Sequence, residues 1–226
     1  WIPSMLQIIG TQLGVIAVYG FQGPLQAGVY YISYAIASVI QAIPSSLFNV
    51  FFPIVSGMED GRKRATWKAI RVGLALVSPI LIIFILYSKV ILSFFGSDYE
   101  EAYLILTILL ASILPTTITQ GVNVLAYAYG IYKFVLIIGI SISLSRIFFY
   151  LTLTPLFGIL GASEAFLIGS FVGLASSLLV TRKLSLKLNW MNISLIILIP
   201  SSLGLISYYL GIGGALIILI LSFLLY

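Results

Sequence analysis

The chain has 226 residues, of which 61% are hydrophobic and only 8% are charged. Soluble domains carry charge on about a quarter of their residues, so a fold in water could not bury this much apolar surface. Cysteine and histidine are both missing, which excludes disulfides, thiolate metal sites and proton transfer by histidine. We therefore expect lipid to be the solvent of this chain.

Hydrophobic stretches long enough to cross a bilayer, which takes about 20 residues in a helix, recur along the sequence. They predict helices over residues 2–19, 28–55, 70–92, 101–128, 134–153, 158–181 and 191–210. A further helix begins near Gly213 and reaches Tyr226. The connectors are too short for a second, soluble domain. The fold class we predict is therefore all-α, a polytopic bundle of transmembrane helices.

Basic residues fall in alternate connectors of this predicted bundle. They are Arg62, Lys63, Arg64, Lys68, Arg71, Lys133, Arg182, Lys183 and Lys187. One connector on the other side holds Lys89 beside Asp98, Glu100 and Glu101. The positive-inside rule places the basic connectors in the cytoplasm of a multi-pass protein of the cell membrane. Basic residues at the membrane surface also attract the anionic headgroups of membrane lipids.

Two predicted helices combine prolines with amide side chains. The residues are Gln41, Pro44, Asn49 and Pro53 in "QAIPSSLFNVFFP", and Pro115, Gln120 and Asn123 in "LPTTITQGVNVLAYAYG". A proline inside a membrane helix removes a backbone hydrogen bond and bends the helix, so we expect bends at all three prolines. Two interpretations of the amides stay open. They are packing contacts between helices, or they line one aqueous or sugar-binding cavity.

Arg146 lies alone in the apolar run "ISISLSRIFFY", and Glu164 is the next charged residue along the chain. A lone charge inside a bilayer costs at least about 2.5–3.5 kcal/mol, so it needs a partner or a function. Counted from the connector between their helices, the two charges lie ~12 and ~9 Å from the same membrane surface. Either they form a permanent pair, or Arg146 reaches outward to the interface, or Arg146 faces a cavity and binds a substrate phosphate.

The sequence contains no motif that indicates an enzyme. There is no P-loop, no serine can pair with a histidine, and the acidic residues lack the spacing of metal ligands. We therefore expect a protein that is not an enzyme, with no catalytic residues, no cofactor, no metal site and no nucleic-acid partner. The candidates for a substrate cavity are Arg146, Glu164, Asn49, Gln41, Asn123 and Gln120.

Three motifs, in this order, resemble polysaccharide flippases of the multidrug/oligosaccharidyl-lipid/polysaccharide exporter superfamily. "AGVYYISYAIASVIQAIPSSLFNVFFPIVSGMEDG" is similar to their eighth span and the following loop. "FFGSDYEEAYLILTILL" resembles an outward loop, and "PLFGILGASEA" resembles the turn between their spans eleven and twelve. The resemblance runs roughly from residue 27 to residue 183.

The resemblance implies a fold of two six-helix lobes around a cavity that opens alternately to each side of the membrane. Residues 1–183 would form the C-terminal lobe and residues 184–226 an additional helix pair with a short last helix. The N-terminal lobe would be absent from this piece of a longer protein. The implied cargo is a lipid-linked oligosaccharide or polysaccharide precursor, flipped from the cytoplasmic to the outer leaflet. That cargo, membrane lipids and the missing lobe are the implied partners.

Two alternative functions stay open. One is a cation-coupled exporter of drugs or metabolites from the same superfamily, and the other is a membrane scaffold subunit without transport activity. The first predicted helix, with "QLGVIAVYG", lacks the acidic residue that relatives often carry in that span, which leaves ion coupling undecided.

Overall fold

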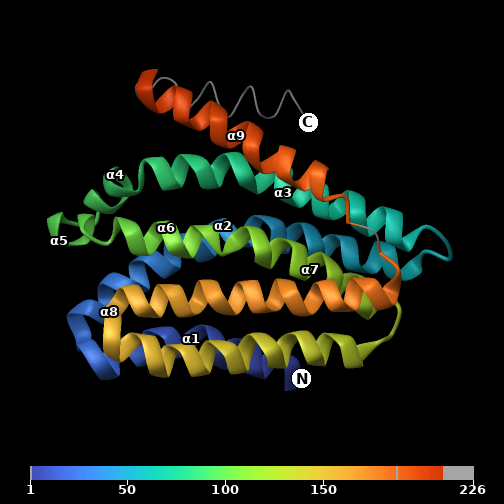
Figure 1. The fold of residues 1–226 in the computed structure, drawn as a ribbon, viewed down its shortest axis with the longest axis horizontal. Helices are drawn as coiled ribbons and strands as arrows, with labels where there is room; N and C mark the ends of the chain where they lie inside the picture. The colour runs from blue at the N-terminus through green and yellow to red at the C-terminus, as the bar shows by residue number, and fades with distance from the viewer. Residues whose placement is uncertain (1, 187, 211–226) are drawn as a thin grey trace.

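The structure is a computed structural model that describes residues 2–186 and 188–210 (Figure 1). The helix predicted from Gly213 onward lies outside these residues. Every regular element in the described ranges is an α-helix, which confirms the predicted all-α fold class. The helices are α1 (Ile2–Gln22), α2 (Pro24–Gly57), α3 (Arg62–Leu86), α4 (Ser88–Ser93), α5 (Ser97–Glu100), α6 (Tyr103–Ala111), α7 (Ile113–Ala128), α8 (Tyr132–Leu184) and α9 (Trp190–Leu210).

Four helical segments of the described chain are long and apolar enough to cross a membrane. They are Pro24–Gly57, Arg62–Leu86, Tyr103–Ala128 and Tyr132–Leu184. The third comprises α6 and α7, which meet at Ser112. These segments support the predicted multi-pass membrane protein.

The long helix α8 bends back on itself at Gly158. Its 53 residues would extend ~80 Å in a straight helix, far more than the ~30 Å of a bilayer core. Gly158 has φ 61° and ψ −137°, which few residues other than glycine adopt. The two arms of α8 therefore run antiparallel (Figure 1), and they correspond to the helices predicted over 134–153 and 158–181.

The start of α3 differs from the sequence prediction. The prediction began this helix at residue 70 and left Arg62 to Lys68 in a connector, whereas the structure has them in its first two turns. Lysine and arginine favour helices, so the helix continues beyond the apolar stretch. The predicted helix also ends earlier, at Leu86, because the backbone leaves the helical conformation at Tyr87.

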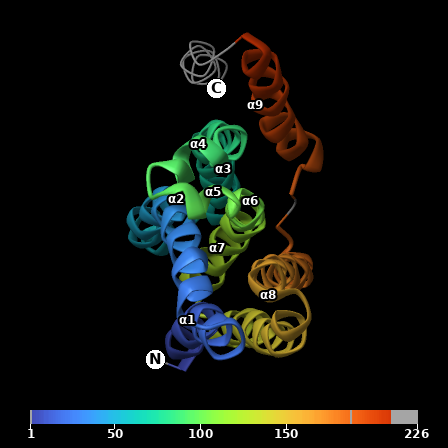
Figure 2. The same cartoon turned by 90° about the vertical axis from the view of Figure 1, so that its left-hand side faces the viewer.

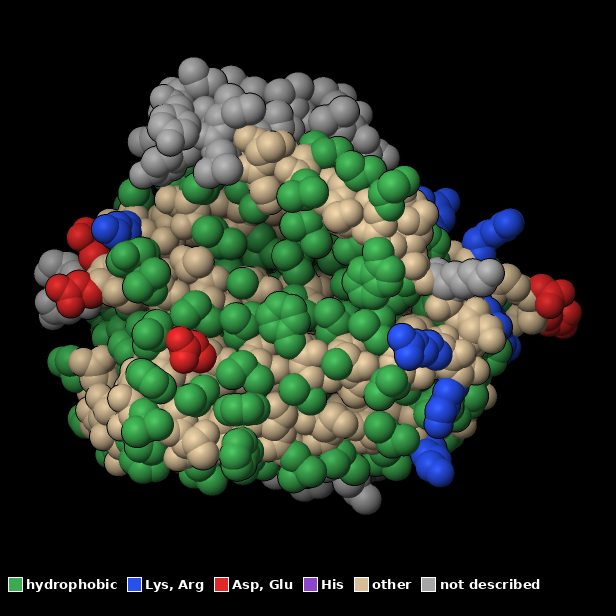
Figure 3. Space-filling view, viewed as in Figure 1, with side chains coloured by type: hydrophobic (Ala, Val, Ile, Leu, Met, Phe, Trp, Pro, Cys, Tyr) green, Lys and Arg blue, Asp and Glu red, His purple; other side chains and the backbone are tan. Residues whose placement is uncertain are grey.

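The helices form a flattened bundle, seen end-on in Figure 2. α1 packs along α8, α7 lies between α2, α3 and α8, and α9 packs mainly on α3. The largest buried cluster joins several helices through Val18, Tyr30, Leu81, Leu106 and Tyr150. Large apolar side chains are also exposed on the outer surface (Figure 3), as expected for a surface that faces lipid.

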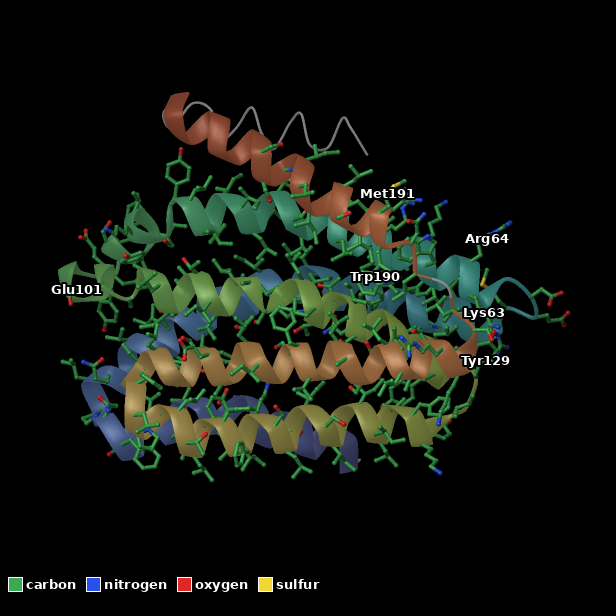
Figure 4. The ribbon with its side chains drawn as sticks, viewed as in Figure 1. Lys63, Arg64, Glu101, Tyr129, Trp190 and Met191 are labelled. Atoms are coloured by element: carbon green, nitrogen blue, oxygen red, sulfur yellow. The ribbon has the colours of Figure 1, made fainter. Side chains whose placement is uncertain are left out.

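Charged side chains gather at the two ends of the bundle (Figure 3). Lysines and arginines collect where the α2–α3 connector, the α7–α8 connector and the end of α8 meet, and we call this the basic end. Lys63 and Arg64 lie at this end, whereas Glu101 lies at the opposite one (Figure 4). The basic and acidic connectors that alternate along the sequence therefore lie at opposite ends of the bundle.

Arg62 ties two helix ends together at the basic end. Its Nε donates to the Met58 carbonyl at 2.6 Å, Nη2 to the Ser56 carbonyl at 3.2 Å, and Nη1 to the Ala128 carbonyl at 2.8 Å. The guanidinium also lies 5.3 Å from the centre of the Tyr129 ring. Carbonyls at helix C-termini lack helical partners and carry partial negative charge, so a cation satisfies them well. Arg62 thereby fixes the end of α2 to the end of α7.

Arg62→Lys should lower the thermal stability of the purified protein in detergent. A lysine keeps the charge but cannot bond three carbonyls in the planar geometry of a guanidinium, at a cost of roughly 1–3 kcal/mol. The control, Lys63→Gln, removes a neighbouring charge and leaves the three bonds intact. Equal unfolding temperatures for the two variants would contradict this role of Arg62.

Candidate substrate cavity

Two cavities, each with several polar side chains in its wall, adjoin in the middle of the bundle. The α2 cavity has a volume of about 220 Å³, with polar lining from Tyr34, Ser38, Gln41, Ser45, Ser112, Thr116, Gln120 and Arg146. The α8 cavity has a volume of about 120 Å³, with polar lining from Thr116, Thr119, Asn123, Tyr127, Ser143, Arg146 and Ser170. Thr116 and Arg146 line both cavities, so the two form one polar region between α2, α7 and α8.

The wall that α2 and α7 share is built from amides and hydroxyls. Ser38, Gln41 and Ser45 recur at helical spacing and so lie on one face of α2. Across the cavity, Gln120 Nε2 donates to Ser45 Oγ at 3.0 Å, and Gln41 Nε2 donates to Gln120 Oε1 at 3.4 Å. These bonds join the two proline-bearing helices and keep their polar groups directed into the α2 cavity.

Arg146 lies between the two arms of α8 and is only 5% exposed. Its Nη2 donates to Ser170 Oγ at 3.2 Å, and its guanidinium carbon lies 3.8 Å from the centre of the Phe166 ring. Tyr34 of α2 packs edge-on against Phe166, with 5.8 Å between ring centres. The guanidinium is therefore held by an aromatic face and a hydroxyl, in a fixed place beside both cavities.

The small residues of the second arm make room for this arginine. A Cβ atom at Gly169 would collide with the Arg146 side chain, whose Cγ lies against the glycine backbone. Glycine here lets the arginine stem pass flat between the arms, and Ser170 receives the end of the side chain.

The charge of Arg146 is not neutralised by any acidic side chain in the described part of the chain. A guanidinium has five N–H donors. Among the described residues, Ser170 is the side chain that accepts a hydrogen bond from Arg146. The Nε atom is buried and has no hydrogen-bond partner among these residues. Burying a cation is costly unless it is paired, so this position favours an anion in the adjoining cavities.

Glu164 does not pair with Arg146. Arg146 lies twelve residues before Gly158 and Ser170 twelve residues after it, so the antiparallel arms place these two at one level. Glu164 is only six residues after Gly158, half-buried and closer to the turn. At 1.5 Å per residue, Arg146 lies ~18 Å from the turn, near the middle of a bilayer core of about 30 Å.

The structure brings four of the six candidate residues together around the cavities. Arg146, Gln41, Gln120 and Asn123 line them, whereas Asn49 is exposed on α2 and, like Glu164, lines neither. The Oδ1 atom of Asn123 is buried without a hydrogen-bond partner among the described residues. Beside the cavities, the described residues thus include one buried donor, Arg146 Nε, and one buried acceptor, Asn123 Oδ1, that form no hydrogen bond.

The three prolines differ in their positions. Pro44 is buried inside α2, close to Gln41 and Ser45, and Pro53 is exposed nearer its end. Pro115 is the third residue of α7, just after the junction with α6 at Ser112. The ribbon of α2 curves along its length (Figure 1).

Sequence reasoning missed Phe166 and Ser170 as neighbours of Arg146. The signal that would have found Ser170 is the glycine in "PLFG". When Gly158 is taken as the centre of the hairpin, residues at equal distance on either side face each other, which selects Ser170 and not Glu164.

An all-α bundle of membrane-spanning helices with polar cavities near the middle of the bilayer is an arrangement typical of transporters. Among solved structures, the lipid II flippase MurJ in an inward closed conformation has the same fold. The TM-score is 0.84 over 99% of this chain and 51% of that chain, at 16% sequence identity.

A curated relative agrees with the structural match. The probable flippase AglR of Haloferax volcanii is 22% identical over 196 residues, which cover 81% of this chain and 40% of AglR. No known protein-family profile matches the sequence. One matched protein is a flippase and the other a probable flippase, in agreement with the resemblance that the sequence motifs indicated. The chain spans about half or less of the length of each.

Gly169→Ala should destabilise the protein, because the added methyl group collides with the Arg146 side chain and overpacking costs about 1–3 kcal/mol. The matched control is Gly28→Ala in α2, where a Cβ atom meets nothing within 4 Å. Alanine favours helices over glycine, so the control should be as stable as the unchanged protein or more so. Thermal unfolding in detergent compares them, and an equal response would contradict the packing of Arg146 on Gly169.

Proposed function

We propose that this chain is one lobe of a membrane transporter that flips a lipid-linked saccharide precursor from the cytoplasmic to the outer leaflet by alternating access. The single observation that carries the proposal is the buried cation of Arg146, which lines both cavities and has no acidic partner among the described residues.

The chemistry of the cavities fits such a substrate. A saccharide linked to a lipid through phosphate presents an anion beside several hydroxyl groups. The planar guanidinium of Arg146 suits a phosphate, which it can bind through two parallel hydrogen bonds. Asn123 and the hydroxyls that line the cavities supply the mixed donors and acceptors that a sugar needs.

The small sizes of the cavities fit a chain that forms only one wall of a transport pathway. Their volumes of about 220 and 120 Å³ are both smaller than the roughly 300–1,000 Å³ of pockets that enclose a ligand. As the resemblance to flippases implies, we propose that residues 1–183 form a C-terminal lobe and residues 184–226 an additional helix pair. A second lobe completes the passage in this proposal, as the lengths of the matched flippases support.

The orientation follows from charge. The basic end carries Arg62, Lys63, Arg64, Lys133 and Arg182, which the positive-inside rule places in the cytoplasm. The opposite end, with Glu101, then faces outward. This orientation supports a location in the cell membrane and entry of the substrate from the basic end.

The two proline-bearing helices are suited to move together. α2 and α7 are joined in the middle by Gln41, Ser45 and Gln120, and at the basic end by Arg62. A pair of helices coupled at two levels moves as one wall, and prolines let each helix change its bend without losing further backbone hydrogen bonds. Such a wall opens the cavities to one side of the membrane at a time.

The test is transport by the complete protein in cells or vesicles. Arg146→Gln should reduce delivery of the lipid-linked glycan to the outer leaflet roughly 10- to 100-fold, because bonds to a charged group are each worth about 1.5–3 kcal/mol. Arg146→Lys should reduce it less, since the charge stays while the fork is lost. In both variants the precursor accumulates at the inner leaflet.

The matched control is Glu164→Gln, which changes a charge on the same helix outside both cavities and should transport normally. The amount of folded protein is measured for every variant. Normal transport by Arg146→Gln would contradict the proposed role. Equal loss of folded protein in Arg146→Lys and Glu164→Gln would instead indicate a structural pair.

A further inference from the structure

A separate cavity of about 200 Å³ lies where α8 ends and α9 begins. Its lining is Leu178, Thr181, Arg182, Leu186, Leu188 and Trp190. It shares no residue with the α2 and α8 cavities, so nothing in the proposed transport pathway accounts for it. The described residues of its lining combine an apolar wall with the cation of Arg182 and the ring of Trp190.

The walls of this cavity are set by how the helices end. The Leu186 N–H donates to the Thr181 carbonyl at 2.9 Å and the Ser185 N–H to the Arg182 carbonyl at 3.3 Å. With Ser185 at φ 54°, these bonds form the Schellman motif that terminates a helix. The turn buries Leu186 and leaves Arg182 exposed at the mouth of the cavity.

The opposite wall is fixed by the start of α9. Asn189 Oδ1 accepts the Asn192 N–H at 3.3 Å, which caps the helix. The cap places Trp190 at the first position of α9, half exposed, on the same end of the bundle as Lys63 and Arg64 (Figure 4). Tryptophan is enriched at the level of lipid headgroups, where one side of its ring is apolar and its N–H is wet.

The charge of Arg182 and the apolar wall of this cavity together indicate what kind of ligand it binds. The Arg182 guanidinium forms no hydrogen bond or ion pair through its side chain in the described part of the chain, and it lies in the last turn of α8, which belongs to the basic end. A guanidinium binds phosphate through its planar fork. Leu178, Leu186 and Leu188 offer a surface for an acyl chain beside that phosphate.

We propose that this cavity binds an anionic phospholipid, with the headgroup phosphate on Arg182 and an acyl chain along the three leucines. The site is distinct from the transport cavities. Its occupant holds α9, which otherwise packs mainly on α3, to the end of α8. The inference does not depend on the transported substrate.

Fluorescence of Trp190 provides the test on the full chain in mixed detergent–lipid micelles. The chain has three tryptophans, so Trp1→Phe and Trp67→Phe together leave Trp190 as the only one. The probes are phosphatidylglycerol and phosphatidylcholine, each with brominated acyl chains that quench a nearby indole. Phosphatidylglycerol should quench at about fivefold lower concentration, the preference expected from one basic residue that meets an anionic headgroup.

Arg182→Gln should abolish this preference. The control is Arg64→Gln, which removes an exposed arginine of the same basic end outside the cavity and should keep the preference. High salt tests the same interaction without a substitution at Arg182, because salt screens the attraction between exposed charges. It should weaken quenching by phosphatidylglycerol and leave quenching by phosphatidylcholine unchanged.

Three results would overturn the proposal. Equal quenching by the two lipids in the protein with Arg182 would mean that Trp190 is only immersed in the micelle. Equal loss of preference in Arg182→Gln and Arg64→Gln would indicate attraction to the whole basic end. Displacement of phosphatidylglycerol by a soluble acidic peptide at equal charge would show that the acyl chain contributes nothing to binding.

Discussion

The buried guanidinium of Arg146 is the interaction on which the rest of this structure depends. A cation near the middle of a bilayer is costly, and the two arms of α8 are arranged to hold it. Gly158 turns the chain back, Gly169 makes room for the side chain, and Ser170 and Phe166 hold its end. These contacts fix the cation without neutralising it. Because Arg146 also lines both cavities, we propose that an anionic group of a substrate binds there.

The polar faces of α2 and α7 line the α2 cavity together with Arg146. Their amides and hydroxyls bond one another across the α2 cavity, and Arg62 joins the same two helices at the basic end. At their opposite ends both helices pack into the largest buried cluster, through Tyr30 of α2 and Ile113 of α7. In the mechanism that we propose, α2 and α7 move together as the wall beside Arg146. The exposed apolar side chains outside these helices suit a surface that faces lipid.

The sequence predicted the larger features because they follow from composition and spacing. Long apolar runs predicted most of the helices, and alternate basic connectors predicted the two ends of opposite charge. The amides of Gln41, Gln120 and Asn123 were interpreted either as packing contacts or as the lining of one cavity. Ser170 was not predicted as the neighbour of Arg146. The depths of Arg146 and Glu164 in the membrane were counted from the two ends of a predicted connector of several residues. The structure turns at the single residue Gly158, and this shifts the register enough to favour Ser170 over Glu164. The exposure of Asn49 depends on packing between helices, which spacing along one helix does not specify.

The most direct test of the central claim measures the charge of the cavity itself. The chain has no cysteine, so Thr116→Cys introduces one thiol at a position that lines both cavities beside Arg146. This thiol should react faster with an anionic than with a cationic thiol reagent, and Arg146→Gln should remove the preference. Equal rates with the two reagents, or a reaction no faster than that of Leu144→Cys on the lipid-facing surface of α8, would contradict the account.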